Sequence, residues 1–213
     1  MKSNLISFKH ENTGLLISLS GIDGSGKTTL LNKLSNHFIE NGLSCLKTKQ
    51  PTPKYRENSL VKKLQSLGTT DVSYEAIALF SAFDRMCHVS ELEKELQNKD
   101  VIFTDRYLLD GIVSFVARGL DKVWVETINS FCPEPHISIL VDCPGGVAQE
   151  RIMARGVTMT YDEKSKEILE FKRNLFLEFC SDSTLVIDGT KDCEAVFKEA
   201  LDHINSQLNK KDM

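Results

Sequence analysis

The sequence has neither a long apolar run nor an excess of positive charge. No apolar run reaches the roughly 18 residues that a membrane-spanning helix needs. Residues 1–13 mix Lys2, Lys9 and Glu11 with few apolar side chains, so they lack the apolar segment of a signal peptide. The 26 Lys and Arg residues are outnumbered by 30 Asp and Glu residues, which gives a formal net charge of -4. General binding of nucleic-acid polymers relies on basic surface. We therefore expect neither a membrane nor a nucleic-acid polymer as a partner.

The cysteines show no C-x-x-C pair and no other sign of a disulfide framework. The six are Cys45, Cys87, Cys132, Cys143, Cys180 and Cys193. A chain of 213 residues can bury enough core to fold without disulfides. We therefore expect free thiols in a reducing compartment, which predicts a cytoplasmic protein.

Apolar content and its pattern predict a folded α/β domain. Hydrophobic residues make up 41% of the chain, which is enough for a sizeable core. Short apolar runs predict strands at 15–20, 44–48, 101–104, 137–141 and 184–187. Helical patterns lie at 27–41, 58–67, 74–98, 108–118, 122–131, 147–155, 163–179 and 193–208.

Apolar strands that alternate with helices are typical of a parallel sheet covered by helices on both faces. The sequence therefore predicts an α/β fold with a five-stranded parallel sheet. We expect one domain over residues 1–213, with frayed ends at 1–13 and 209–213.

A glycine-rich segment between the first predicted strand and helix predicts a phosphate-binding loop. Residues 21–29 read Gly-Ile-Asp-Gly-Ser-Gly-Lys-Thr-Thr and match G-x-x-x-x-G-K-[ST]. Backbone N–H groups of such a loop, together with the start of the helix, bind phosphate oxygens. Lys27 is predicted to reach the β- and γ-phosphates, and the Thr28 hydroxyl is suited to bind Mg²⁺. The proposed ATP-binding residues in this segment are Gly21, Ile22, Asp23, Gly24, Ser25, Gly26, Lys27, Thr28 and Thr29.

Phosphate binding alone leaves several activities open, including a GTPase or ATPase switch. Residues 142–145 match D-x-x-G, and residues 209–212 match N-K-x-D, two motifs of such switches. The first match lies some 120 positions beyond the loop, and the second lies in the C-terminal tail instead of after a strand. We interpret both as chance matches, and we keep the switch as an alternative.

The loop sequence resembles that of thymidylate kinases, and Asp23 is its distinguishing residue. A carboxylate beside a triphosphate needs a purpose, such as holding Mg²⁺, a water or an arginine. Further segments resemble the same family in the same order, at 79–85, 105–107, 117–120, 135–144, 150–156 and 186–189. The resemblance covers roughly residues 14–208.

This resemblance implies a nucleoside monophosphate kinase fold of the P-loop type with a short lid at about 156–166. It implies transfer of the γ-phosphoryl group of ATP to a nucleoside monophosphate. The default acceptor is dTMP, which would give dTDP. The implied cofactor is Mg²⁺, and the implied assembly is a homodimer. A kinase of the same fold that uses another or a modified nucleotide remains an alternative.

The resemblance also assigns roles to residues near the ends of the predicted strands. Asp105 would hold Mg²⁺ through a water, and Arg106 would bind the acceptor phosphate. Phe80 and Arg85 resemble the pair that stacks on thymine and hydrogen-bonds it, although they are five positions apart instead of four. The proposed substrate-binding residues are Lys49, Pro51, Phe80, Arg85, Arg106 and Tyr107.

Several positions depart from the family pattern. Lys49-Gln50-Pro51 replaces Arg-Glu-Pro, and Ser20 replaces a Glu before the loop. Phe115 replaces a Gln near the base. These changes do not affect the prediction of phosphoryl transfer. They leave open which base the acceptor nucleotide carries.

The predicted lid contains no arginine. Segment 157–166 offers only Lys164 and Lys166 as cations. Arg155, just before the lid, is therefore predicted to close over the donor phosphates, aided by Arg151 four positions earlier. The catalytic residues predicted from the sequence are Lys27, Asp23, Arg106 and Arg155.

Overall fold

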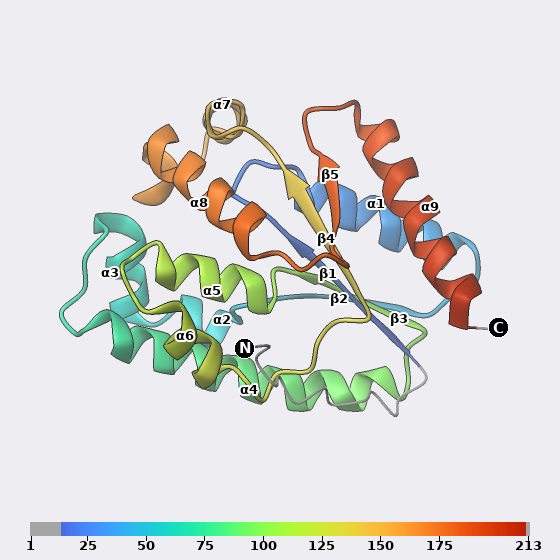
Figure 1. The fold of residues 1–213 in the computed structure, drawn as a ribbon, viewed down its shortest axis with the longest axis horizontal. Coiled ribbons are helices and arrows are strands. Elements are labelled where there is room, and N and C mark those ends of the chain that lie inside the picture. The colour runs from blue at the N-terminus through green and yellow to red at the C-terminus, as the bar shows by residue number, and fades with distance from the viewer. Residues whose placement is uncertain (1–13, 212–213) are drawn as a thin grey trace.

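A computed structural model of the chain describes residues 14–211 and shows an α/β fold built on one parallel sheet (Figure 1). The strands are β1 (Leu15–Ser20), β2 (Cys45–Lys49), β3 (Val101–Asp105), β4 (Ile137–Asp142) and β5 (Leu185–Asp188). Their order across the sheet is β2-β3-β1-β4-β5, and every neighbouring pair is parallel. The predicted fold class is confirmed.

Helices cover both faces of this sheet. They are α1 (Lys27–Glu40), α2 (Pro53–Arg56), α3 (Ser59–Leu67), α4 (Tyr74–Leu96), α5 (Leu108–Val116), α6 (Lys122–Ile128), α7 (Gly145–Ala154), α8 (Lys166–Phe179) and α9 (Cys193–Lys211), with a 3₁₀ turn η1 (Asp162–Lys164). Helices α1 and α9 lie on one face, and α4 and α5 lie on the other (Figure 1).

Alternation along the strands explains these two layers. On β1, Ile17 and Leu19 pack among the apolar residues of α1 and α9, whereas Leu16 packs against α4. Successive side chains of a strand point to opposite faces of the sheet. Residues on both faces of β1 are buried, although Ser18 and Ser20 share a face with Leu16, so helices cover both faces.

Local capping groups set where several helices begin. The Ser73 hydroxyl accepts a hydrogen bond from the Ala76 N–H at 3.2 Å and caps α4. The Ser165 hydroxyl accepts from the Ile168 N–H at 3.2 Å and caps α8. Because Ser165 starts a new helix, the helix predicted over 163–179 is instead a 3₁₀ turn followed by α8.

Two further expectations differ from the structure. No helix was predicted at 53–56, but α2 begins at Pro53, since proline is well accommodated in a first helical turn. Helix α9 runs to Lys211, past the predicted end at 208, so 209–211 continue the helix. The predicted fraying of 1–13 and of 212–213 concerns residues outside those described. None of the helices among residues 14–211 is long and apolar enough to cross a membrane.

The parallel arrangement brings the carboxyl ends of all strands to one edge of the sheet. Lys49 at the end of β2 stands in register with Asp105 at the end of β3, and Asp105 stands in register with Leu19 of β1. Ligands of open α/β sheets bind outside this edge. The glycine-rich loop, which follows β1, lies at the same edge.

Candidate active site

The loop between β1 and α1 folds tightly against a neighbouring helix. A Cβ atom on Gly24 would lie 2.3 Å from the Ala148 carbonyl oxygen of α7, so only glycine fits there. The Lys27 ammonium turns back over the loop and donates to the Ile22 carbonyl at 2.7 Å. Lys27 is 4% exposed. Burial, together with the nearby positive charge of Arg106, lowers the pKa of Lys27 to about 8. The ammonium is therefore short of negative charge, which a phosphate would supply.

Oxygen atoms next to the loop form a small site suited to a hard cation. The Thr28 hydroxyl donates to Asp105 Oδ2 at 3.0 Å, and the Lys49 ammonium lies 3.1 Å from the same oxygen. The other oxygen, Asp105 Oδ1, is buried and has no hydrogen-bond partner within residues 14–211. A buried unpaired carboxylate oxygen is costly unless something binds it. A hydroxyl and a carboxylate are the oxygen donors that Mg²⁺ prefers, so these residues fit that ion.

Arg106 lies between the loop and the start of α5. Its backbone has φ of 72°, an unusual value for a residue other than glycine. The Arg106 N–H donates to the Leu19 carbonyl at 2.9 Å, which helps to hold this conformation. The guanidinium forms an ion pair with Asp23 and donates to Asp110 Oδ1 at 3.2 Å. Sites of backbone strain often coincide with function.

Burial alone would lower the pKa of Arg106, but the carboxylates of Asp23 and Asp110 raise it well above the ordinary value. Burial would likewise raise the pKa of Asp23, but Arg106 and Lys27 hold it well below the usual range. Asp23 is therefore ionised. Of the partners considered for its carboxylate, which were Mg²⁺, a water or an arginine, the structure shows an arginine, Arg106.

Asp110 is a functional candidate that the sequence reasoning missed. Its Oδ2 accepts a hydrogen bond from Ser20 Oγ at 2.7 Å, and its Oδ1 accepts from Arg106. Ser20 stands where the family resemblance expects a Glu. The structure therefore keeps a carboxylate beside the loop, but α5 carries it instead of β1. The change at position 20 was the sequence signal for this exchange.

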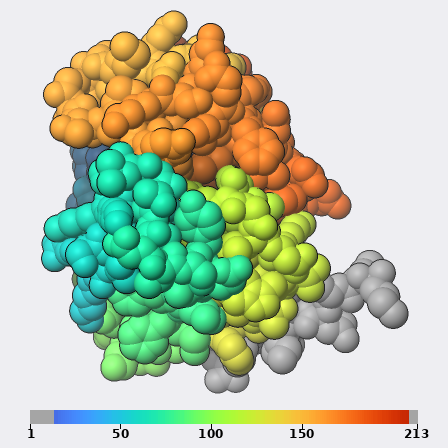
Figure 2. Space-filling view, turned by 90° about the vertical axis from the view of Figure 1, so that its left-hand side faces the viewer, coloured from blue at the N-terminus to red at the C-terminus, as the bar shows by residue number. Residues whose placement is uncertain are grey.

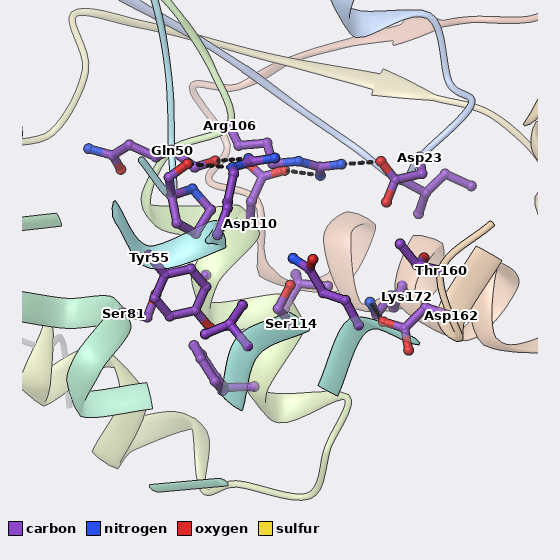
Figure 3. Close-up of a pocket in the computed structure, with 18 of the residues that line it drawn as sticks. Asp23, Gln50, Tyr55, Ser81, Arg106, Asp110, Ser114, Thr160, Asp162 and Lys172 are labelled. Atoms are coloured by element: carbon purple, nitrogen blue, oxygen red, sulfur yellow. Dashed lines mark hydrogen bonds and ion pairs between the residues drawn. The ribbon is translucent and has the colours of Figure 1, made fainter. Parts of the chain in front are cut away.

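A cavity of about 400 Å³ opens next to Arg106 (Figure 3). It lies between the loop, the segment after β2, helices α4 and α5, and the residues around η1. Most of the predicted acceptor residues line it, namely Lys49, Pro51, Arg85, Arg106 and Tyr107. The structure therefore brings these residues together.

Phe80 is the exception. It is not one of the described residues that line the cavity, and its ring packs 5.3 Å from the ring of Tyr55, which does line it. Ser81, four positions before Arg85, faces the cavity instead. The five-residue spacing explains this, because one extra residue turns a side chain about 100° around a helix. Tyr55 of α2 lines the cavity next to Phe80, and the sequence did not predict this aromatic side chain.

Arg85 is held in place from two sides. Its Nε donates to Gln50 Oε1 at 3.1 Å, and its Nη1 bonds to Asn129 Oδ1. A Cβ atom on Gly111 would lie 2.3 Å from Arg85 Nη2, so the glycine makes room for the guanidinium. These contacts fix a buried cation at the cavity wall.

Three further cations line the cavity and were not predicted. Arg56 donates to the carbonyls of Pro51 at 2.6 Å and Gln50 at 3.1 Å. Arg118 donates to Asp162 Oδ2 at 2.8 Å, and Lys172 of α8 forms an ion pair with the same carboxylate. These residues are far apart in sequence, so only the fold reveals that they share a site.

The segment before α8 bridges the cavity. The Tyr161 N–H donates to the Gln65 carbonyl of α3 at 2.6 Å, and the Tyr161 ring packs on Gly68. In Figure 2 the orange atoms of this part of the chain meet the cyan-green atoms of α3. This is the segment that the sequence predicts to be a lid.

Arg151 and Arg155 occupy different surroundings. Arg151 Nη1 donates to the Gly189 carbonyl at 2.8 Å and lies 3.5 Å from the Ser25 carbonyl of the loop. Arg155 ends α7, is exposed, and lines the cavity. Arg151 therefore lies beside the loop, whereas Arg155 lies at the cavity.

The two motifs that suggested a switch have other surroundings. Asp142 forms an ion pair with Arg173 at 2.6 Å and ends β4. Residues 209–211 lie within α9 instead of following a strand. The position of Asp212 is outside the described residues.

Comparison with known proteins shows a match over most of the chain. A family model described as thymidylate kinase matches residues 19–200. A protein of Pyrococcus abyssi named "Probable thymidylate kinase" is 38% identical over 172 residues, which cover 78% of this chain and 81% of the relative. A "Probable thymidylate kinase 1" of Saccharolobus solfataricus is 33% identical over 91% of this chain and 98% of its own. A "Thymidylate kinase" of Xylella fastidiosa is 32% identical over 88% of this chain and 85% of its own.

Proposed function

Because this chain belongs to the thymidylate kinase family, we propose that it transfers the γ-phosphoryl group of ATP to dTMP, giving ADP and dTDP. The observation that carries the proposal is the position of Arg106. Its guanidinium reaches the phosphate loop at Asp23 and also lines the 400 Å³ cavity. A cation at this junction can bind an acceptor phosphate directly beside the donor phosphates.

The loop binds ATP. The loop N–H groups and the start of α1 surround the donor phosphates, and Lys27 neutralises them. The buried Lys27 ammonium has too little compensating negative charge before ATP binds, so binding relieves an electrostatic cost. Arg151, beside the loop at the Ser25 carbonyl, adds positive charge to the same side.

Thr28 and Asp105 would hold Mg²⁺ together with phosphate oxygens and water. When bound, Mg²⁺ neutralises phosphate charge. Within residues 14–211 no group of three or more His, Cys, Asp or Glu side chains is arranged to bind a metal. Metal binding at this site therefore depends on the nucleotide.

The acceptor phosphate binds to Arg106. A planar guanidinium can donate two parallel hydrogen bonds to one phosphate. Asp23 and Asp110 hold the guanidinium in position until the acceptor arrives. Lys49, whose ammonium lies 3.1 Å from Asp105 Oδ2, and Arg56 line the same cavity and add positive charge for the phosphate.

The rest of the acceptor extends toward α4. Arg85 supplies hydrogen-bond donors for the base, while Tyr55, Pro51 and Tyr107 supply apolar walls. Phe80 supports Tyr55 from behind, in place of the direct stacking that the sequence suggested.

Transfer requires alignment and charge compensation more than covalent help. The bond from the γ-phosphorus to the β-phosphate oxygen breaks as the acceptor oxygen bonds to the γ-phosphorus. Lys27 and Arg106 lie on the donor and acceptor sides of this transfer. Arg155, exposed at the end of α7, would approach the transferred group from the lid side.

A monophosphate panel tests the proposal. The protein is incubated with Mg-ATP and, separately, with dTMP, dUMP, dCMP, dGMP, AMP and GMP, and ADP release is measured. We expect the highest kcat/KM with dTMP. Fastest turnover of another monophosphate would favour the alternative kinase, a possibility raised by Phe115 and Ser81 at the cavity wall. ATP or GTP hydrolysis that no acceptor stimulates would favour a switch.

We also propose that the protein is a homodimer with α4 at the interface. Leu79, Phe83 and Met86 are spaced four and three residues apart, so they form one exposed apolar stripe along α4. We further propose that residues 1–213 form a single domain with a lid at about 156–166. We also propose that the protein acts in the cytoplasm, where ATP and nucleotides are abundant.

A further inference from the structure

Lys172 is a half-buried cation to which the mechanism above gives no role. It projects from α8 into the cavity, and its side chain is 13% exposed. The lysines of the lid segment, Lys164 and Lys166, are exposed and do not line the cavity. Burying an ammonium is costly unless a negative charge compensates it. The position of Lys172 therefore calls for an explanation.

The carboxylate next to Lys172 is shared between two cations. Asp162 Oδ2 forms an ion pair with Lys172 and another with Arg118 at 2.8 Å. One carboxylate between two cations gives this group of three side chains a net positive charge. If Lys172 moved away, Asp162 would keep Arg118 as a partner. Lys172 can therefore change partners without leaving a buried carboxylate unpaired.

Lys172 also lies on the side of the cavity next to the phosphate loop. Figure 3 shows Lys172 and Asp162 beside Thr160, on the side of the cavity where Asp23 lies. Lys172 is close enough to Asp23 for its charge to contribute to the low pKa of that carboxyl. Burial and the charge of Arg118 lower the pKa of Lys172 itself. An incoming anion would relieve this cost.

We propose that Lys172 is a catalytic residue whose ammonium leaves Asp162 and contacts the phosphoryl group during transfer. In the resting protein Asp162 holds Lys172 at the cavity wall. When ATP and the acceptor are bound, the transferred group carries negative charge in the space between Asp23 and the lid segment. The lysines of the lid segment are exposed and do not line the cavity. Lys172 therefore supplies positive charge to the transferred group from α8. This proposal rests on the proposed kinase function.

Kinetics of matched variants test the assignment. Lys172→Met keeps the aliphatic stem and removes the charge, and we expect kcat to fall by about 100-fold. The dissociation constants of ATP and of dTMP, measured by calorimetry, should change by less than about threefold, because the ammonium acts mainly on the transferring group. Lys172→Arg should restore part of kcat. Lys166→Met, a control at the exposed start of the same helix, should leave kcat unchanged.

Asp162→Asn separates this role from a merely structural ion pair. The proposal predicts that Asp162→Asn retains most of kcat, because Lys172 remains and the amide oxygen still accepts a hydrogen bond. A structural ion pair predicts equal losses of kcat and of melting temperature in Asp162→Asn and Lys172→Met. That result, or a Lys172→Met kcat within threefold of wild type, would overturn the proposal.

A failure of the Lys172 proposal can be distinguished from a failure of the proposed kinase function. If wild type phosphorylates another monophosphate faster than dTMP, the dTMP assignment fails and Lys172 is tested on that acceptor. If wild type shows only hydrolysis of ATP that no acceptor stimulates, both proposals fail.

Discussion

Arg106 illustrates how single residues depend on partners from distant parts of the chain. Its two carboxylate partners, Asp23 and Asp110, come from the loop after β1 and from α5. The sequence indicated Arg106 because it follows an apolar strand. Ser20 signalled that the expected carboxylate was missing from β1, but it could not identify Asp110 as the replacement, because the two residues are 90 positions apart. Residues next to strand ends were thus predictable, whereas their supporting contacts were not.

Arg106→Lys tests the need for a planar guanidinium. The substitution keeps the charge but loses the paired hydrogen bonds to a phosphate, so we expect kcat/KM for dTMP to fall by about 100-fold. The dissociation constant of ATP should change by less than about threefold, because Lys27 and the loop bind the donor. Steady-state kinetics and calorimetry measure the two quantities. A kcat/KM near that of wild type would show that Arg106 does not bind the acceptor phosphate in this way.

The pH dependence of ATP binding tests the state of Lys27. In the folded protein without ligand, burial lowers the pKa of Lys27 to about 8, so the ammonium form is lost as pH rises above 8. Phosphate binds the ammonium form, so ATP binding should weaken by up to about tenfold per pH unit above 8. Calorimetry from pH 7 to pH 9.5 measures this slope. Lys27→Met, which has no proton to lose, provides the control and should lack the Lys27-dependent slope.

Among the secondary-structure elements, those with strong apolar patterns were predicted well. Strand β1 was predicted with the bounds Leu15–Ser20, and α1 begins at Lys27 as predicted. Strands β2 and β5, although short, were also predicted to within one residue. The start of α8 was not, because it depends on the capping bond of Ser165. The aromatic wall at Tyr55 was missed because its helix, α2, is only four residues long and begins with proline.

Gly68, at the end of α3, links this helix to the lid segment. It has φ of +72°, and a Cβ atom there would lie 2.5 Å from the Tyr161 ring. Gly68→Ala should destabilise the protein by about 2 kcal/mol or more, from the left-handed backbone and from the clash with Tyr161. Chemical denaturation measures the free energy of unfolding.

The double variant Gly68→Ala with Tyr161→Ala separates the two causes. Without the ring the clash disappears, so the combined loss should be smaller than the sum of the two single losses. Strictly additive losses would mean that the Tyr161 ring does not pack on Gly68 in solution.

At the scale of the whole molecule, the parallel sheet explains why the site lies where it does. All five strands end at one edge, which brings Asp105, Arg106 and the loop together. This could be predicted from the sequence, since alternating strands and helices imply a parallel sheet. The shape of the acceptor cavity could not, because α3, α4 and the lid segment build it through tertiary contacts.

The exposed stripe on α4 makes the assembly testable. Phe83 is 64% exposed, and Leu79 and Met86 flank it on the same face of the helix. Phe83→Glu would place a charge in the centre of a dimer interface, so we expect the mass in solution to change from about 48 kDa to that of the 23.9 kDa chain. Light scattering coupled to size exclusion measures the mass. A Ser90→Glu variant, also on the exposed side of α4 but one turn beyond the stripe, serves as the control. A wild-type protein of 23.9 kDa would contradict the dimer.

Direct transfer of labelled phosphate tests the central claim, that this protein is a dTMP kinase. The protein is incubated with Mg-ATP labelled at the γ-phosphate and with dTMP, and the products are separated and counted. The account predicts labelled dTDP in equal amount to the ADP formed, with little labelled inorganic phosphate. Label found in inorganic phosphate, with none in dTDP, would contradict it.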